Sequence, residues 1–199
     1  QAAQEIVGIR APYKHFGTMH ILNSKRGTYY IADTLVNRHP DKETIKDVAR
    51  LTAEAIRFFN DEPRIAMISY TNFGTDSIGS PKMVSDAVRE LQEEYPDLKI
   101  DGEMSVDLAL DHERRDEKYP FLRLHNEVVN SMVFPNLSSA SSAYKLIKQF
   151  SPETEVIGPI QMGLNKPIHF TDFDASVRDI VNITAVAVID AYVEKLKKK

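Results

Sequence analysis

The spacing of apolar residues along the chain predicts strands and helices in alternation. Two β-rich runs, at 15–23 and 27–37, flank three polar or charged residues, as the two strands of a hairpin do. The run at 64–70 is apolar almost without interruption, which is typical of a parallel strand covered on both faces. Further strands are predicted at 98–104, 128–134 and 156–162.

Between the strands, apolar residues return every three or four positions, which predicts helices with one buried face. Asp41 is the expected cap of the first helix and Ser80 that of the second. A last helix is predicted from about 176 to the end of the sequence. Its section 183–189 is apolar nearly all round, so we expect it to be deeply buried or packed on another subunit.

Strands that alternate with helices predict a largely parallel sheet with helices on both faces, which is a three-layer α/β/α sandwich. The 199 residues are enough to bury one substantial core. The segment 111–118 combines many charges with no apolar period. Two interpretations of it stay open, a mobile loop or an exposed helix end.

Composition narrows the classes of protein. The net charge of -4 argues against a nucleic-acid partner, because such partners require a basic surface. No apolar run approaches the roughly 20 residues of a membrane span, and the first residues lack the pattern of a secretory signal. The sequence has no cysteine, which fits a reducing compartment. We therefore expect a soluble, cytoplasmic protein without a membrane or nucleic-acid partner.

Candidate chemistry lies in the loops after the strands, because ligands of open parallel sheets bind beyond the carboxyl ends of strands. The loop 71–81 places glycines and hydroxyls ahead of a helix, which can hold a phosphate or simply form a turn. The loop 135–139 also precedes a helix, with Asn136 or Ser138 as its cap. Glycine motifs for dinucleotides or ATP are missing, and the six histidines lack metal-ligand spacing.

Five stretches together resemble the phosphotransacetylase family, in the family's order. They are IADTLVNRHP, EPRIAMISYTNFGT, DLKIDGEMSVDLAL, FPNLSSASSAYKLI, and GPIQMGLNKPIHF running into SVRDIVNITAVAVIDA. Within that family, NFGT, GEMSVD and SVRDIVN are similar to the version fused behind NADP-dependent malic enzymes. The resemblance implies an oligomeric α/β/α fold akin to isocitrate and isopropylmalate dehydrogenases. It also implies that residues 1–199 are the C-terminal part of such a domain, with its first lobe missing.

The resemblance also implies that catalytic groups are lost. Catalytic members carry a Ser-Arg pair after the NKP motif and an Asp seven residues after that Ser, positions that fall on Asp172, Phe173 and Asp179. Phe173 cannot donate the forked hydrogen bonds of arginine, and Asp172 would repel a phosphate. By resemblance Asp179 is the remaining catalytic acid. By local pattern it belongs to a capping box with Ser176, and the second interpretation is favoured.

The expected function is therefore an acetyl-CoA-binding regulatory domain of an NADP-dependent malic enzyme, without transferase activity of its own. The alternatives are an active phosphate acetyltransferase and an oligomerisation module without a ligand. Expected partners are the malic enzyme catalytic domains of a longer chain, which would hold NADP and a divalent metal, and further copies of the chain. The residues expected to contact acetyl-CoA are Thr71, Asn72, Phe73, Gly74, Thr75, Gly163, Asn165 and Lys166.

Overall fold

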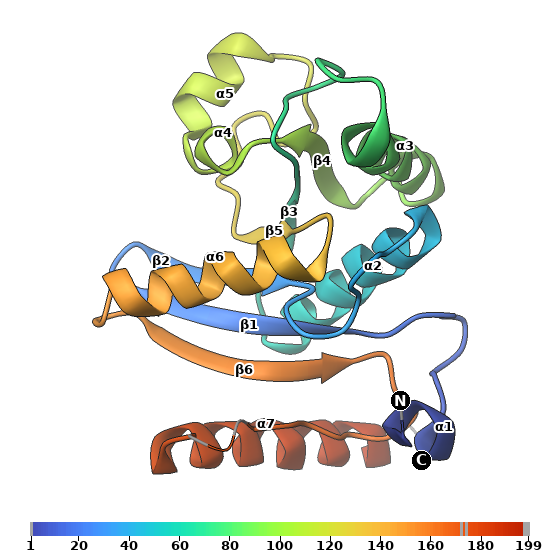
Figure 1. Ribbon diagram of the computed structural model, residues 1–199, viewed down its shortest axis with the longest axis vertical. Coiled ribbons are helices and arrows are strands. Elements are labelled where there is room, and N and C mark those ends of the chain that lie inside the picture. Colours follow the sequence, from blue (N-terminus) through green and yellow to red (C-terminus); the bar gives the residue numbers. More distant parts are fainter. Residues whose placement is uncertain (1, 172, 174, 197–199) are drawn as a thin grey trace.

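The computed structural model describes residues 2–171, 173 and 175–196 (Figure 1). Helices and strands alternate along most of the chain, as the apolar pattern predicts. The helices are α1 (Ala2–Val7), α2 (Lys42–Phe58), α3 (Gly79–Glu94), α4 (Val106–Leu110), α5 (His112–Lys118), α6 (Leu137–Phe150) and α7 (Val177–Leu196). The strands are β1 (Gly17–Ser24), β2 (Gly27–Ala32), β3 (Arg64–Ile68), β4 (Lys99–Met104), β5 (Ser131–Val133) and β6 (Glu155–Met162).

The strands form one sheet in the order β4-β3-β5-β2-β1-β6. β2, β5, β3 and β4 pair in parallel, whereas β1 is antiparallel to both of its neighbours, β2 and β6. The predicted hairpin of β1 and β2 is confirmed, with Ser24 opposite Gly27 at its tip. The sheet is therefore largely parallel, and β6 points the same way as the four parallel strands.

Two apolar cores lie on opposite faces of the sheet and make the three predicted layers. Along β3, Ile65 and Met67 belong to one core, and Ala66 and Ile68 belong to the other, because successive strand residues point to opposite faces. The first core also receives side chains from α2, α3 and α7, and the second from α4 and α6. The helices therefore cover both faces, as a parallel sheet requires.

For the caps of α2, α3 and α6, the sequence is right in two of three cases. Asp41 accepts a hydrogen bond from the Thr44 main-chain nitrogen at 2.8 Å, and Asn136 accepts one from that of Ser139 at 3.0 Å. The prediction for Ser80 is wrong, because the cap residue of α3 is Ile78, two residues earlier, and it makes no side-chain hydrogen bond. Ser80 therefore lies inside the first turn.

The charged segment 111–118 is helical and well anchored. The side chain of Asp111 caps α5, and Arg115 in that helix is fully buried. The guanidinium of Arg115 donates to the carbonyl oxygens of Ala109, Leu124 and Glu127. The segment is therefore a helix and not a mobile loop, but the buried Arg115 shows that it is also not an exposed helix end.

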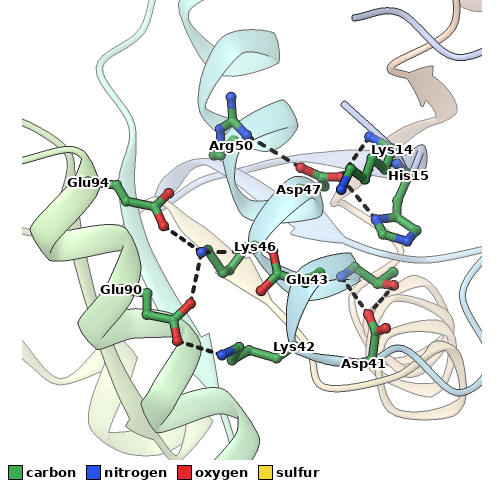
Figure 2. A network of polar contacts seen from close by, with 11 residues as sticks. Lys14, His15, Asp41, Lys42, Glu43, Lys46, Asp47, Arg50, Glu90 and Glu94 are labelled. Atoms are coloured by element: carbon green, nitrogen blue, oxygen red, sulfur yellow. Dashed lines mark hydrogen bonds and ion pairs between the residues drawn. The ribbon is translucent and has the colours of Figure 1, made fainter. Parts of the chain in front are cut away.

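A network of ion pairs joins α2 to α3 (Figure 2). Lys46 of α2 is 7% exposed, and its Nζ lies 2.9 Å from Glu90 and 2.6 Å from Glu94, both on α3. Lys42 reaches Glu90 one turn earlier, at 2.5 Å. Burial tends to lower the pKa of Lys46, but hydrogen bonds to Glu94 and Glu90 outweigh it and raise that pKa. The side chain is therefore charged at neutral pH.

Helix α7 packs on the edge strand β6, yet most of its apolar surface is open. Ile183 and Val186 are its only buried residues. Deep burial of this helix, one of two expected arrangements, is therefore absent from the described chain. None of the described helices combines the length and the apolar character that a membrane crossing requires. The exposed apolar residues of α7 are Val177, Ile180, Val181, Val188, Ile189, Tyr192 and Leu196.

Candidate functional site

The eight residues expected to contact acetyl-CoA fall into two separate groups. Thr71 to Thr75 follow β3, whereas Gly163, Asn165 and Lys166 follow β6. Three strands lie between β3 and β6, so at a spacing of roughly 4.8 Å per strand the two strand ends are on the order of 19 Å apart. In Figure 1 the β3–α3 connection lies near the top of the long axis and the end of β6 near the bottom. The structure does not bring the two groups together.

The loop after β3 uses its main-chain N–H groups internally. The nitrogen of Phe73 donates to the main-chain oxygen of Glu103 at 2.9 Å, and that of Gly74 to the Glu103 carboxylate at 2.7 Å. The nitrogen of Thr75 donates to the oxygen of Asn72 at 3.3 Å. These three donors are therefore not available to a phosphate. In this loop the glycine-rich pattern forms a turn held by a buried glutamate.

The second group lines a groove of about 660 Å³ between α2, the segment after β6, and α7. Ligand pockets have volumes of roughly 300–1,000 Å³, so a small molecule fits. Its apolar walls include Leu51 and Phe58 of α2, Phe59 at the end of that helix, and Met162 of β6. The groove therefore combines apolar and aromatic walls with the polar residues that the sequence singled out.

Backbone geometry fixes the β6 end of this groove. Gly163 has φ of +86°, a conformation that other residues rarely adopt, and a Cβ there would lie 2.8 Å from a methyl carbon of Leu51. Asn165 then joins the segment to the N-terminal residues, because its main-chain nitrogen donates to Gly8 and its side-chain amide to Val7, both at 3.1 Å. Glycine is therefore required where the chain leaves β6 and passes over α2.

Three cationic side chains line the groove. Lys166 is paired with Glu194 of α7 at 3.1 Å, and Arg10 with Glu54 of α2. Within residues 2–171, 173 and 175–196, the guanidinium of Arg57 has no hydrogen-bond or ion-pair partner. Exposed ion pairs contribute little to stability, so Lys166 can exchange its partner at low cost.

A buried histidine that sequence analysis missed also lines the groove. His169 is 4% exposed in its side chain, and its Nδ1 lies 3.1 Å from the main-chain nitrogen of Gln161. Burial lowers the pKa of His169, and the charge of Asp190 opposes that effect. The only sequence signal was its place two residues after the NKP motif. Among the described residues no three His, Cys, Asp or Glu side chains converge as metal ligands would.

The positions that the resemblance aligned with catalytic groups do not form a site. Asp172 lies outside the described residues. Phe173 is fully exposed, and the nearest arginine along the chain, Arg178, is paired with Glu155 of β6 at 2.8 Å. No described residue therefore supplies a guanidinium in place of the arginine of the catalytic pair in this segment.

Asp179 forms the capping box that its local pattern predicts. Its carboxylate accepts from the main-chain nitrogen of Ser176 at 2.9 Å and from the Ser176 hydroxyl at 2.8 Å. The Asp179 nitrogen donates back to that hydroxyl at 3.2 Å. These hydrogen bonds hold the pKa of Asp179 below its usual value, so the carboxylate is a weaker base.

Comparison with known proteins agrees with this architecture. The crystal structure of a phosphotransacetylase from Streptococcus pyogenes superimposes with a TM-score of 0.89 at 27% identity, over 96% of this chain and 58% of that one. The fold is thus of the phosphotransacetylase type. The model of the phosphate acetyl/butaryl transferase family matches residues 1–188. The chain belongs to this family.

Curated relatives fall into two kinds. The NADP-dependent malic enzyme of Escherichia coli (strain K12) is 37% identical over 97% of this chain, which spans 25% of that relative. The phosphate acetyltransferase of Clostridium acetobutylicum is 36% identical over 84% of this chain and 50% of that relative. The chain is homologous to the C-terminal region of such malic enzymes, and it spans about a quarter of their length.

Proposed function

We propose that this chain is a regulatory domain of an NADP-dependent malic enzyme that binds acetyl-CoA as an effector without transferring its acetyl group. The oxidative decarboxylation of malate, with its NADP and divalent metal, would belong to the rest of a longer protein. We expect that protein to be cytoplasmic. An active phosphate acetyltransferase is the competing function, and relatives with that name are among the similar proteins.

The observation that carries the proposal is the state of the family's catalytic positions. A general base for a thiol works best with a pKa near the working pH, whereas hydrogen bonds from Ser176 hold the pKa of Asp179 low. Phosphoryl groups are bound well by the forked donors of arginine. Phe173 offers no such donor, and the next arginine along the chain, Arg178, lies five residues further on, inside α7.

The groove between α2 and α7 supports binding. Acetyl-CoA carries an aromatic ring, phosphates, a flexible amide-containing arm and a thioester. Phe58 and Phe59 offer aromatic surface, and Arg10, Arg57 and Lys166 offer positive charge. Because the two groups of expected contact residues are far apart, we assign acetyl-CoA to this groove and not to the loop after β3.

Regulation requires only that acetyl-CoA prefer one arrangement of the domain. A coupling free energy of about 1–3 kcal/mol between two sites changes affinity five- to 150-fold. Helix α7 provides one route, because it forms a wall of the groove and also exposes apolar surface to a further subunit or domain.

Two measurements test the proposal on the chain and on the full-length enzyme. Calorimetry should detect binding of acetyl-CoA. A coupled assay with acetyl phosphate and CoA should detect no acetyl transfer. Turnover at the rate of a true phosphate acetyltransferase would establish the competing function. If neither the chain nor the full-length enzyme binds acetyl-CoA, the remaining function is an oligomerisation module without a ligand.

Replacement of Lys166 tests the location. Lys166→Ala should weaken acetyl-CoA binding about tenfold, because one charge-assisted contact to a phosphate is lost. The matched control is Lys25→Ala, since Lys25 is an exposed lysine at the hairpin tip. If both variants bind as tightly as the unaltered chain, the groove assignment is wrong.

A further inference from the structure

The groove contains a hydrogen-bond donor that lacks an acceptor. Nδ1 of His169 lies 3.1 Å from the main-chain nitrogen of Gln161, which has a hydrogen to donate. Nδ1 is therefore the acceptor, and the neutral ring carries its proton on Nε2. Nε2 is buried and has no hydrogen-bond partner among the described residues. Buried polar groups are nearly always paired, so this N–H group requires an explanation.

The unpaired donor faces the wall that α7 contributes to the groove. Nε2 lies 4.0 Å from a carboxylate oxygen of Asp190, which is too far for a hydrogen bond. Both side chains line the groove. The side chain of Asp190 is 41% exposed, so it stands between Nε2 and the open part of the groove. A ligand atom that displaces Asp190 from this place would meet Nε2.

The surroundings of His169 restrict which group can approach. Ile160, Met162 and Val186 line the same groove and are each at most 9% exposed. A ligand group that fits here has a hydrogen-bond acceptor for Nε2 and a small apolar substituent for these side chains. An acetyl group has this composition, with a carbonyl oxygen beside a methyl group.

We infer that the Nε2–H group of His169 binds the acyl carbonyl oxygen of the ligand and makes the groove select acyl thioesters over free CoA. The inference rests on the proposed function. Free CoA ends in a thiol, and a thiol sulfur is only a weak acceptor. With CoA bound, the donor would stay unpaired. Sites built to pair with a polar group discriminate strongly against analogues that lack it.

Two replacements separate the nitrogens of the ring. In His169→Asn the side-chain oxygen lies near the position of Nδ1, so the bond from Gln161 is kept and the Nε2 donor is lost. In His169→Gln the side-chain amide nitrogen reaches the position of Nε2, so a donor is kept and the Nδ1 acceptor is lost. If His169 acts only by holding Gln161, His169→Asn should keep the preference for acetyl-CoA and His169→Gln should lose it. If His169 recognises the ligand through Nε2, the two variants should behave the other way round.

Calorimetry with acetyl-CoA and with CoA, on the unaltered chain and both variants, decides between them. We expect the unaltered chain to bind acetyl-CoA at least tenfold more tightly than CoA. His169→Asn should lose this preference while its affinity for CoA stays unchanged, and His169→Gln should keep most of the preference.

Contrary results are distinguishable. If the unaltered chain shows the preference and His169→Asn retains it, the role of His169 is refuted and the proposed function stands. If neither the unaltered chain nor the full-length enzyme binds either ligand, the proposed function falls and the inference with it. If His169→Gln fails to fold, as a melting curve would show, His169→Asn alone decides by the same criterion.

Discussion

At the scale of single residues, Asp179 connects the sequence and the structure most directly. The pattern Ser176 to Asp179 predicts a capping box, and the reciprocal hydrogen bonds between the two residues are present. The position of Asp179 in the family motif predicts a catalytic acid instead. Both interpretations follow from the sequence, and the three bonds favour the structural one.

Asp179→Ala should lower the free energy of unfolding by about 1 kcal/mol, as loss of a helix cap does, and leave acetyl-CoA binding unchanged. The folded-state pKa of Asp179 lies below its usual value, so its contribution is present above pH 3.8 and is lost as pH falls through the folded-state pKa. Urea unfolding at pH 7 and pH 3 measures both effects, with Glu93→Ala as a control on an exposed acid. Loss of acetyl-CoA binding with normal stability would restore the catalytic interpretation.

His20 should make stability depend on pH. Its ring is buried, stacks on Tyr144 at 4.0 Å and lies 2.8 Å from the Thr34 hydroxyl. Burial, aided by the charges of Lys148 and Lys145, lowers the pKa of His20 to about 3. The unfolded chain binds a proton near pH 6.5 and the folded chain does not, so stability falls as pH drops below 6.5 and towards 3.

The expected slope from His20 is about 1.4 kcal/mol per pH unit over that range. Denaturant unfolding at pH 7, 6 and 5 measures it. His20→Asn should be less stable at pH 7 and should have a shallower slope. An unchanged slope in this variant would mean that His20 is not the group that titrates.

At the scale of elements, periodic apolar residues predicted α2, α3 and α6, because each buries apolar side chains three or four positions apart. The same rule fails for α5, where the buried side chain is the charged Arg115. It also fails for α7, because a helix that is apolar all round does not indicate which face meets the sheet. A local pattern predicts whether a segment is a helix or a strand. It predicts which surface packs on the rest of the protein only when the apolar residues lie on one side.

The ion-pair network between α2 and α3 should contribute measurably to stability. Lys46→Met should lower the free energy of unfolding by about 1–3 kcal/mol, because Glu94 and Glu90 then lie close together with less positive charge between them. The loss is limited because Lys42 remains beside Glu90. The raised pKa of Lys46 means that its contribution is present at neutral pH and is lost only as pH rises through its folded-state pKa.

A double-mutant cycle of Lys46→Met and Glu94→Gln isolates that pair, with unfolding free energies at pH 7 as the measurement. The double variant should be more stable than the sum of the two single losses implies. Strict additivity would show that Lys46 and Glu94 do not interact in solution.

At the scale of the whole molecule, the sequence predicted the layers but not the site. Alternating strands and helices are enough for a three-layer fold, because few other arrangements bury them. Which strand ends lie side by side depends on the order β4-β3-β5-β2-β1-β6, and no local pattern encodes that order. The expected contact residues after β3 and β6 were therefore grouped into one site, whereas three strands separate them.

The apolar surface of α7 predicts self-association. Soluble monomers rarely expose large continuous apolar patches, and Val188 is 62% exposed near the middle of this one. In sedimentation analysis the unaltered chain should form an assembly larger than a monomer, and Val188→Glu should shift it to a smaller species. Leu146→Glu on α6, where Leu146 is 59% exposed, is the control and should leave the mass unchanged. A monomeric unaltered chain would contradict the prediction.

The pairing of β1 with β6 has a consequence for the order in which the molecule can fold. Gln161 donates to the main-chain oxygen of Gly17, which lies 144 residues earlier. During synthesis β1 can pair with β2 at once, but its other edge has no partner until β6, more than 130 residues further along, has left the ribosome. Closing so long a segment is slow, and unpaired strand edges invite pairing with other chains. Chains that end before β6 should therefore be prone to aggregate, even though most of the apolar core precedes that point.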